Sequence, residues 1–288
     1  MGAKQQKIRE VNQMSPGVSI FLTILIASMA VLFLLPILII LINSLKGKFY
    51  ISDAPFQLPF GEMYAGITNY INGITKTGLP EAFGWSTFIT VCSVFLIIIF
   101  TSMTAWFITR VKNRFTSALY YLFVFAMIVP FQMVMFTMVR VANVLYLDNP
   151  LGILLIYLGF GSGLSVFMFS GFLKSVPLEI EEAAMIDGCN PLQTYARVVF
   201  PILKPTVVTV AILNAMWIWN DYLLPYLVIG SDYKTIPIAI QYLRGGYGSI
   251  DMGAMMAMLV LAIIPIVIFY LLCQKHIIKG VAAGAVKG

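Results

Sequence analysis

The sequence predicts an all-α integral membrane protein with six transmembrane helices, and two observations carry this prediction. First, 60% of the 288 residues are hydrophobic, only 10% are charged, and the mean hydropathy is +0.93, whereas soluble domains carry about 45–50% apolar and about 25% charged residues. Second, six apolar stretches are each long enough to cross a hydrocarbon layer of about 30 Å as a helix. The alternation typical of membrane β-barrel strands does not recur along the chain.

Polar connections separate the six predicted spans. The first span follows several cations, as a secretory signal would, but its apolar run is roughly twice the length of a signal core, which predicts a retained anchor. Only the fifth span contains a charged residue, Asp221. The spans are Val18–Leu45, inside an uncharged stretch that begins at Val11, then Phe83–Thr109, Phe115–Val139, Asn149–Leu173, Pro205–Gly230 and Met252–Gln274.

The distribution of Lys and Arg predicts the orientation of the chain. If the N-terminus is cytoplasmic, twelve of the eighteen Lys and Arg residues lie in internal segments and six in external ones, as the positive-inside rule requires. We therefore expect a multi-pass protein of a bacterial-type cytoplasmic (inner) membrane with both termini cytoplasmic. The predicted organisation is an N-terminus over residues 1–17, a transmembrane domain over 18–274 that includes an internal loop, 174–204, and a tail over 275–288.

Composition and motifs exclude several kinds of site. The three cysteines have no metal-binding spacing and His276 is the only histidine, so we predict no metal site. The sequence has no G-x-x-x-x-G-K-[ST] loop to cradle nucleotide phosphates, so the chain is expected to hold no cofactor and not to be an enzyme. The net charge of +6 reports the orientation of a membrane protein and gives no reason to expect a nucleic acid partner.

The internal loop, 174–204, predicts two short helices. Pro177 and the glutamates that follow it suit the first turn of a helix, where negative charge complements the helix dipole. Gly188 suits the left-handed residue just after that helix. Asn190 is expected to cap a second helix together with Gln193, three residues later.

The first of these two helices concentrates negative charge, and two interpretations compete for it. It is either an amphipathic connector on the membrane surface or a docking element for a cytoplasmic protein. Anionic lipid would repel the charge, which favours docking. A DNA-binding helix-turn-helix is excluded, because phosphate contacts need cations. The four acidic residues are Glu179, Glu181, Glu182 and Asp187.

The same loop resembles the EAA loop of ABC importer permeases. It reads Glu182-Ala183-Ala184, three residues, Gly188, nine residues, and then Val198-Val199-Phe200-Pro201. The family pattern is EAA, three residues, G, nine residues, I, any residue, L and P, so five of the seven fixed positions are identical and two carry apolar exchanges. The tail from Lys279 to Gly288 is similar to the ending of maltose-permease-type subunits, which indicates the carbohydrate-import branch.

The resemblance implies the type I ABC importer permease fold and a permease subunit for an oligosaccharide-type sugar. It implies three kinds of protein partner in the lipid bilayer or beside it: a second homologous permease subunit, two ATP-binding subunits that hold ATP and Mg, and an extracytoplasmic solute-binding protein. The first loop helix would be the coupling helix that transmits ATPase closure to the spans. The residues implied in this coupling are Glu181, Glu182, Ala183, Ala184, Asp187, Gly188 and Pro201.

The fifth span offers candidates for the substrate path. Asn214, Trp217 and Asp221 fall at i, i+3 and i+7, on one helical face, and polar groups in a membrane tend to face a cavity or another helix. An aromatic ring beside amide and carboxylate groups suits a sugar. The alternative is an interfacial aromatic belt of Trp217, Trp219 and Tyr222, with Asp221 in contact with water.

Two other membrane features are open at this stage. Gly159, Gly161 and Gly163 in the fourth span indicate either a helix interruption beside the path or a small-residue contact with a neighbouring helix, and the contact is favoured. Pro130 and Gln132 in the third span are weaker path candidates.

The external loop from Gly230 to Asp251 is the candidate contact for the solute-binding protein. In the resembled family this loop reaches toward that partner, and here glycine gives it freedom while tyrosine gives it contact area. The alternative is an ordinary solvated loop. The candidates are Tyr242, Arg244, Gly245, Gly246 and Tyr247, with Tyr233 in the same loop.

Two functions of another class compete with the importer subunit. An ATPase-independent channel or secondary carrier needs buried ionisable relays or repeated half-helices, yet five of the six predicted spans have no charge in their interiors. An intramembrane enzyme needs catalytic dyads or metal ligands in the spans, and the sequence offers neither. The importer subunit is therefore the favoured function.

Overall fold

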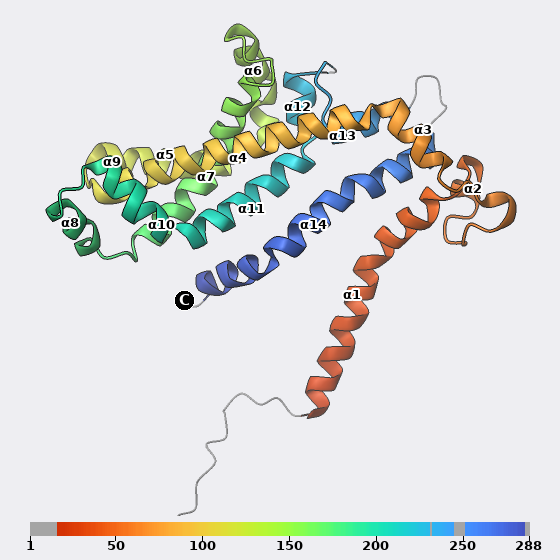
Figure 1. The fold of residues 1–288 in the computed structure, drawn as a ribbon, viewed down its shortest axis with the longest axis horizontal. Helices are drawn as coiled ribbons and strands as arrows, with labels where there is room; N and C mark the ends of the chain where they lie inside the picture. Colours follow the sequence, from red (N-terminus) through yellow and green to blue (C-terminus); the bar gives the residue numbers. More distant parts are fainter. Residues whose placement is uncertain (1–15, 231, 245–250, 286–288) are drawn as a thin grey trace, which may run out of the picture.

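The computed structural model describes residues 16–230, 232–244 and 251–285, and its long elements are all helices (Figure 1). Within these ranges, four helices are long and apolar enough to cross a membrane, and two bent helix pairs bring the total to six if each pair is one span. The predicted all-α membrane architecture is thus confirmed. The four long helices are α1 (Pro16–Ser44), α4 (Leu79–Arg110), α7 (Gly152–Leu173) and α14 (Met252–Ala285).

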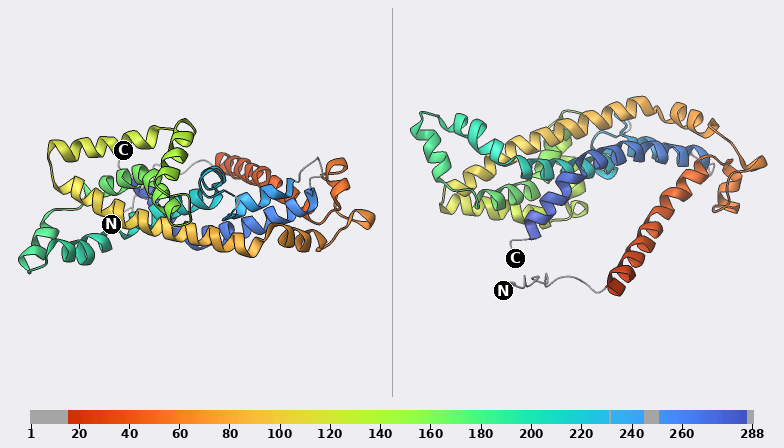
Figure 2. Two further views of the ribbon diagram at one scale, coloured as in Figure 1. Left: turned by 90° about the horizontal axis from the view of Figure 1, so that it is seen from above. Right: turned by 60° about the horizontal axis from the view of Figure 1, so that its bottom comes forward.

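The core forms where α4 packs along α7, with α11 (Lys204–Asn220) lying against both helices. Ile97, Tyr157 and Phe169 are completely buried in this contact. The helix α14 packs against α11 and continues past Gln274, the predicted end of the sixth span, to Ala285. Figures 1 and 2 show these helices as one elongated layer. At one end lie the short helices α8 (Glu179–Ile186) and α9 (Pro191–Thr194), and at the other lie α2 (Lys48–Asp53) and α3 (Thr68–Thr77).

The third span is not one continuous helix, which corrects the expected run Phe115–Val139. The chain forms α5 (Arg114–Ile128) and α6 (Phe131–Val144), and the two helices are bent by 107° at the break between them. Pro130 causes the break, because proline lacks the N–H that the helix needs and disfavours helical geometry in the residue before it. Val129 is accordingly extended, with ψ 116°. As a result α6 projects away from the layer of long helices (Figure 1).

The fifth span is also interrupted, which corrects the expected run Pro205–Gly230. The helix α11 ends at Asn220, and a separate short helix, α12 (Leu223–Val228), follows it. Before α11 the chain turns by 76° between the segment 191–202 and α11. The segment 191–202 begins at Pro191, and α11 has Pro205 in its first turn. These prolines explain the turn, because proline is tolerated in a first helical turn but not in a helix interior.

The helix α1 matches the predicted anchor but stands apart from the layer. It contacts α14 near the end of α1 at Ser44 and then diverges from it (Figures 1 and 2). At this same end Ser44 Oγ lies 2.8 Å from Tyr70 Oη, which belongs to the connection between α1 and α4. None of its most apolar 18-residue window is buried. Such a surface is stable only against lipid or another protein chain.

The end of the layer opposite α8 is closed by a folded connection between α1 and α4. It contains α2 (Lys48–Asp53), a 3₁₀ turn (Gly61–Met63) and α3 (Thr68–Thr77). The fully buried Lys46 donates from Nζ to the Ala54 carbonyl at 2.6 Å, so this segment is tied back onto the end of α1.

Candidate functional site

The internal loop folds as predicted into two short helices. The first, α8 (Glu179–Ile186), is followed two residues later by Gly188, whose φ of +88° lies in the left-handed region. In that conformation Cys189 N donates to the Ala184 carbonyl at 3.0 Å, a bond pattern typical of a glycine-terminated helix. Gly188 therefore forms the sharp turn that the sequence predicts at this position.

The second helix, α9 (Pro191–Thr194), begins with the predicted reciprocal cap. Asn190 Oδ1 accepts from Gln193 N and Gln193 Oε1 accepts from Asn190 N, both at 2.9 Å. A π-helical turn, 195–199, then leads into α10 (Phe200–Ile202), where Pro201 is exposed. The loop is thus a compact unit that projects beyond the end of α4 (Figure 2).

The outward surface of α8 combines charge with apolar side chains. Glu179, Glu182 and Asp187 are exposed, as is Ala183, whereas Ala184 is buried. Beside these carboxylates the Ile186 side chain is 85% exposed. A helix that shows both carboxylates and uncovered apolar groups outside the spans suits a protein cleft better than water.

Glu181 points the other way and is only 3% exposed. Its carboxylate accepts from Trp106 Nε1 at 2.8 Å, from Arg110 Nε at 2.9 Å and from Arg110 Nη2 at 2.6 Å. Arg110 Nη2 also donates to the Val176 carbonyl at 3.0 Å. These charge-assisted bonds attach two positions of the loop, Glu181 and Val176, to the end of α4.

A second contact joins the loop to α4 two turns earlier. Tyr195 Oη lies 2.6 Å from Ser102 Oγ, and the Tyr195 ring lies 5.7 Å from the Trp106 ring. Because Ser102, Trp106 and Arg110 are four residues apart, they form one face of α4. We call these three residues, with Glu181 and Tyr195, the coupling clamp.

The coupling clamp was not predicted from the sequence. Glu181 was expected to belong to the acidic patch, which in the structure is made of the other three carboxylates only. One signal could have revealed the clamp. Three side chains with hydrogen-bond donors recur at i, i+4 and i+8 at the end of an otherwise apolar span, namely Ser102, Trp106 and Arg110.

In the membrane region, the predicted face of α11 lies against α7. Asn214 is 4% exposed, and its Nδ2 donates to Ser165 Oγ at 3.2 Å and to the Val210 carbonyl at 2.9 Å. Its amide nitrogen is therefore satisfied within the helix contact. Asn214 holds α11 and α7 together in this structure.

Trp217 and Asp221 both contact Tyr157 of α7. The Tyr157 hydroxyl donates to Asp221 Oδ2 at 3.1 Å, and the Tyr157 ring packs edge-on against Trp217 with ring centroids 5.4 Å apart. Asp221 Oδ1 accepts from Leu223 N at 3.0 Å, so the carboxylate also caps α12. Trp217 is 39% exposed and is the most exposed of the three candidates on this face, whereas Asp221 is partly buried and Asn214 is buried.

The glycines of the fourth span make a helix contact, which confirms the favoured alternative. The helix α7 runs through them without interruption. A Cβ on Gly161 would lie 2.6 Å from Ile97 Cδ1, and a Cβ on Gly163 would lie 2.8 Å from the Phe123 carbonyl oxygen. At Gly159 nothing lies within 4 Å of such a Cβ. Two of the three glycines therefore allow close packing.

Comparison with known proteins agrees with this geometry. The family described as "binding-protein-dependent transport system inner membrane component" matches residues 97–283, which is most of the chain. The chain belongs to this family. The matched region contains α4 from Ile97 onward, the whole internal loop and α11, so every residue of the coupling clamp falls within it.

Full-length relatives of the permease carry similar descriptions. It is 41% identical to the "probable starch degradation products transport system permease protein AmyC" of Thermoanaerobacterium thermosulfurigenes, over 92% of this chain and 96% of that one. It is 36% identical to the "multiple sugar-binding transport system permease protein MsmG" of Streptococcus mutans, over 89% and 93%. A solved bacterial ABC transporter for alginate import superposes with a TM-score of 0.75 at 24% identity, over 92% of this chain and 99% of that one. The expected type I ABC importer permease fold is confirmed.

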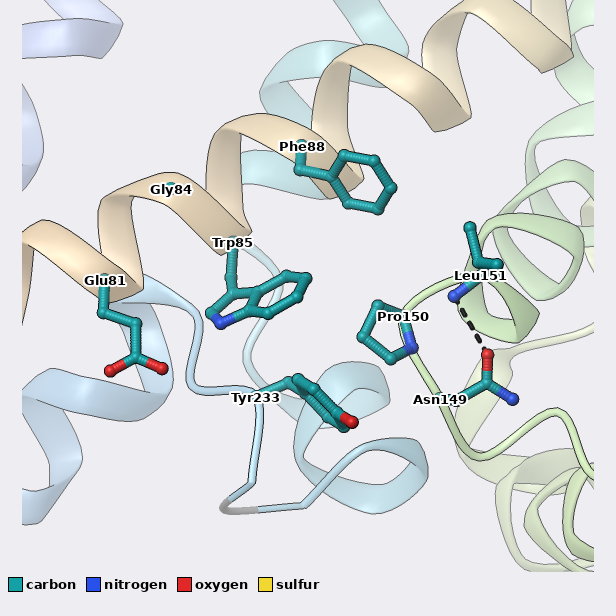
Figure 3. Close-up of a pocket in the computed structure, with 8 residues that line it drawn as sticks. All are labelled: Glu81, Gly84, Trp85, Phe88, Asn149, Pro150, Leu151 and Tyr233. Atoms are coloured by element: carbon teal, nitrogen blue, oxygen red, sulfur yellow. Dashed lines mark hydrogen bonds between the residues drawn. The ribbon is translucent and has the colours of Figure 1, made fainter.

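The permease has a pocket of about 770 Å³ between α4, the segment before α7 and the segment that holds Tyr233 (Figure 3). Trp85 and Tyr233 meet edge-on with ring centroids 5.0 Å apart, and Phe88 lies 6.1 Å from Trp85. Glu81 and Asn149 contribute polar groups. The structure thus brings Tyr233 together with residues of α4, which the sequence did not predict.

The other external-loop candidates are only partly described. Tyr242 is half-exposed, and Lys234 Nζ lies 4.3 Å from the centroid of its ring. Arg244 lies in a 3₁₀ turn, Tyr242–Arg244. The candidates Gly245, Gly246 and Tyr247 lie outside the described residues.

Proposed function

We propose that this permease forms half of the translocation path of an ATP-driven, binding-protein-dependent importer of oligosaccharide-type sugars. The family of the chain and the sugar-related descriptions of its relatives support the substrate class. This half of the path lies along the contact between α7 and α11, where Trp217 remains accessible. A second homologous permease supplies the other half.

The coupling loop carries the proposed energy transfer. The exposed carboxylates and Ile186 of α8 face an ATP-binding subunit, while Glu181 on the opposite side attaches the same helix to α4. A rigid helix that is held on both sides converts movement of one partner into movement of the other. Closure of the ATPase pair therefore moves α4, and with α4 the helices packed against it.

This mechanism assigns ATP and Mg to the two ATP-binding subunits, with no nucleotide in the permease. It places the loop end of the layer and both termini in the cytoplasm, in agreement with the Lys and Arg distribution. The outer end, with Tyr233 and Tyr242, then faces the solute-binding protein. The chain acts as a transport subunit of the complex in the cytoplasmic membrane.

The observation that carries the proposal is the bonding of Glu181 to α4, and the test measures coupling directly. The complete complex is reconstituted in proteoliposomes, and sugar uptake and ATP hydrolysis are followed together. Glu182→Lys reverses an exposed charge on α8, and Gly188→Pro removes the left-handed turn, because proline is confined to φ near −65°. Both are expected to abolish uptake that depends on ATP while the complex remains in the membrane.

Matched controls separate coupling from general damage. Glu62→Lys makes the same charge reversal on an exposed residue of the outer 3₁₀ turn and is expected to leave uptake unchanged. Wild-type uptake in Glu182→Lys and Gly188→Pro would contradict the docking role of α8. Wild-type uptake without ATP would instead favour a channel or secondary carrier.

A further inference from the structure

A second pocket lies at the loop end of the layer, where α4, α5 and α7 meet. Its volume is about 450 Å³. Its charged lining residues are all cations, Arg110, Lys112 and Lys174, and its polar lining is otherwise hydroxyl groups, among them Thr116, Ser117 and Ser170. Cations and hydroxyl donors converging on one concave site are the chemistry that binds a phosphate group.

Ser170 shows that this pocket has an unsatisfied polar group. Its side chain is 1% exposed, and its Oγ has no hydrogen-bond partner among the described residues. A buried hydroxyl without a partner costs free energy, so such groups normally bond to a water or a ligand. Because Ser170 lines the pocket, a bound acceptor oxygen there would satisfy it.

The three cations differ in how many hydrogen bonds and ion pairs they already form within the chain. Arg110 uses Nε and Nη2 for Glu181 and Val176, which leaves Nη1 without a partner among the described residues. Lys112 and Lys174 are exposed, and within the described chain neither forms an ion pair. Lys174 Nζ lies 5.3 Å from the Tyr120 ring centroid. Two ammonium groups outside ion pairs and one guanidinium nitrogen, Nη1, thus remain for an anion.

The surface beside the pocket indicates where the anion comes from. Along α5, starting at the pocket, Tyr121, Phe125 and Ile128 are 69%, 64% and 67% exposed, and their i, i+4, i+7 spacing makes one continuous strip. A strip of this kind suits acyl chains, and tyrosine is enriched at the level of lipid headgroups. A free phosphate ion has no apolar part that could contact this strip.

We propose that this pocket binds the headgroup of an acidic phospholipid, with the phosphate at Lys112, Lys174 and Ser170 and the acyl chains along the α5 strip. Cationic pockets between transmembrane helices are known to suit anionic headgroups. The site shares Arg110 with the coupling clamp, so the lipid lies one side chain away from Glu181. The assignment needs only the membrane location of the chain and does not depend on which solute is carried.

The test compares lipids on the purified complete complex in mild detergent. Thermal unfolding is measured after addition of phosphatidylglycerol, phosphatidylcholine or inorganic phosphate. Wild type is expected to show a clearly larger rise in Tm with phosphatidylglycerol than with either other addition. Lys112→Gln/Lys174→Gln is expected to lose at least half of that rise, and Ser170→Ala part of it.

A double variant at the other end provides the control. Lys48→Gln/Lys234→Gln removes the same charge from the external segments and is expected to keep the full rise. An undiminished rise in Lys112→Gln/Lys174→Gln would overturn the proposal, as would an equal rise with phosphatidylcholine. A rise with inorganic phosphate equal to that with phosphatidylglycerol would overturn the lipid assignment in favour of a free anion.

Discussion

Arg110 and Glu181 are separated by 71 positions in the sequence and form a buried ion pair, with Nη2 2.6 Å from Oε1. The pair joins the end of a membrane-spanning helix to a short helix outside the spans. Its side chains are 18% and 4% exposed, so neither charge has free access to water. The pair therefore acts as a fixed joint between the internal loop and α4.

Removing one partner of this joint should affect both stability and coupling. Glu181→Ala leaves the Arg110 charge without its partner, and breaking a buried pair in this way costs about 3–5 kcal/mol. Glu181→Gln can still accept from Trp106 and should lose less. We expect a lower Tm for both variants and a lower ratio of sugar taken up to ATP hydrolysed, measured in proteoliposomes. If Glu181→Ala kept the wild-type ratio of sugar taken up to ATP hydrolysed, that result would contradict a coupling role for the clamp.

Trp217 should contribute to sugar recognition. Trp217→Ala is expected to raise the sugar concentration for half-maximal uptake several-fold, because the accessible aromatic face on the proposed path is lost. Loss of its edge contact with Tyr157 should also cost about 0.5–1.5 kcal/mol. Trp219→Ala is the matched control, since Trp219 lies on the same helix and makes a similar edge contact with Phe83 at 5.7 Å. Equal uptake kinetics in the two variants would exclude Trp217 from the path.

The glycines of α7 allow a comparison of nearly identical substitutions. Gly163→Ala places a methyl group against the backbone of α5, and overpacking of this kind costs about 1–3 kcal/mol. Gly159→Ala adds the same group in open space and should be neutral or slightly stabilising, because alanine favours helix. Thermal unfolding of both variants in detergent checks this order. A reversed order would show that α7 packs differently in the assembled protein.

The contact of Asp251 with Lys76 should make stability depend on acid pH. Burial alone would raise the pKa of Asp251, but the hydrogen bond and charge of Lys76, together with the Ala254 amide, bring its pKa below the ordinary value. The stabilisation is thus present above the ordinary carboxyl pKa and is lost as pH falls through the lowered one. The effect is at most about 1 kcal/mol, because Lys76 is half-exposed. Asp251→Asn should reduce the fall in Tm between pH 6 and pH 3, and an unchanged fall would exclude this pair as its source.

Local rules predicted the parts of the structure that depend on neighbouring residues. The left-handed Gly188 and the Asn190 cap follow from side chains within a few positions of one another, and the long uncharged runs gave four spans directly. Pro130 was visible in the sequence, but hydropathy alone does not separate a proline-bent span from a continuous one, so the break was missed.

The parts that were not predicted depend on distant contacts. The helix α8 has only eight residues, which is too short for its periodicity to separate an inward Glu181 from the outward carboxylates. Its partner Arg110 is in another helix. In the same way, Asn214 and Trp217 share a predicted face, but only the position of α7 shows that one is covered and the other accessible.

The measurement that tests the central claim most directly is purification of the permease from its native membrane in mild detergent, with identification of the proteins that accompany it. For wild type we predict a P-loop ATPase and a second homologous permease. For Glu182→Lys we predict retention of the second permease and loss of the ATPase. Recovery of the wild-type chain alone, or only with copies of itself, would contradict the claim that it is the permease subunit of an ATP-driven importer.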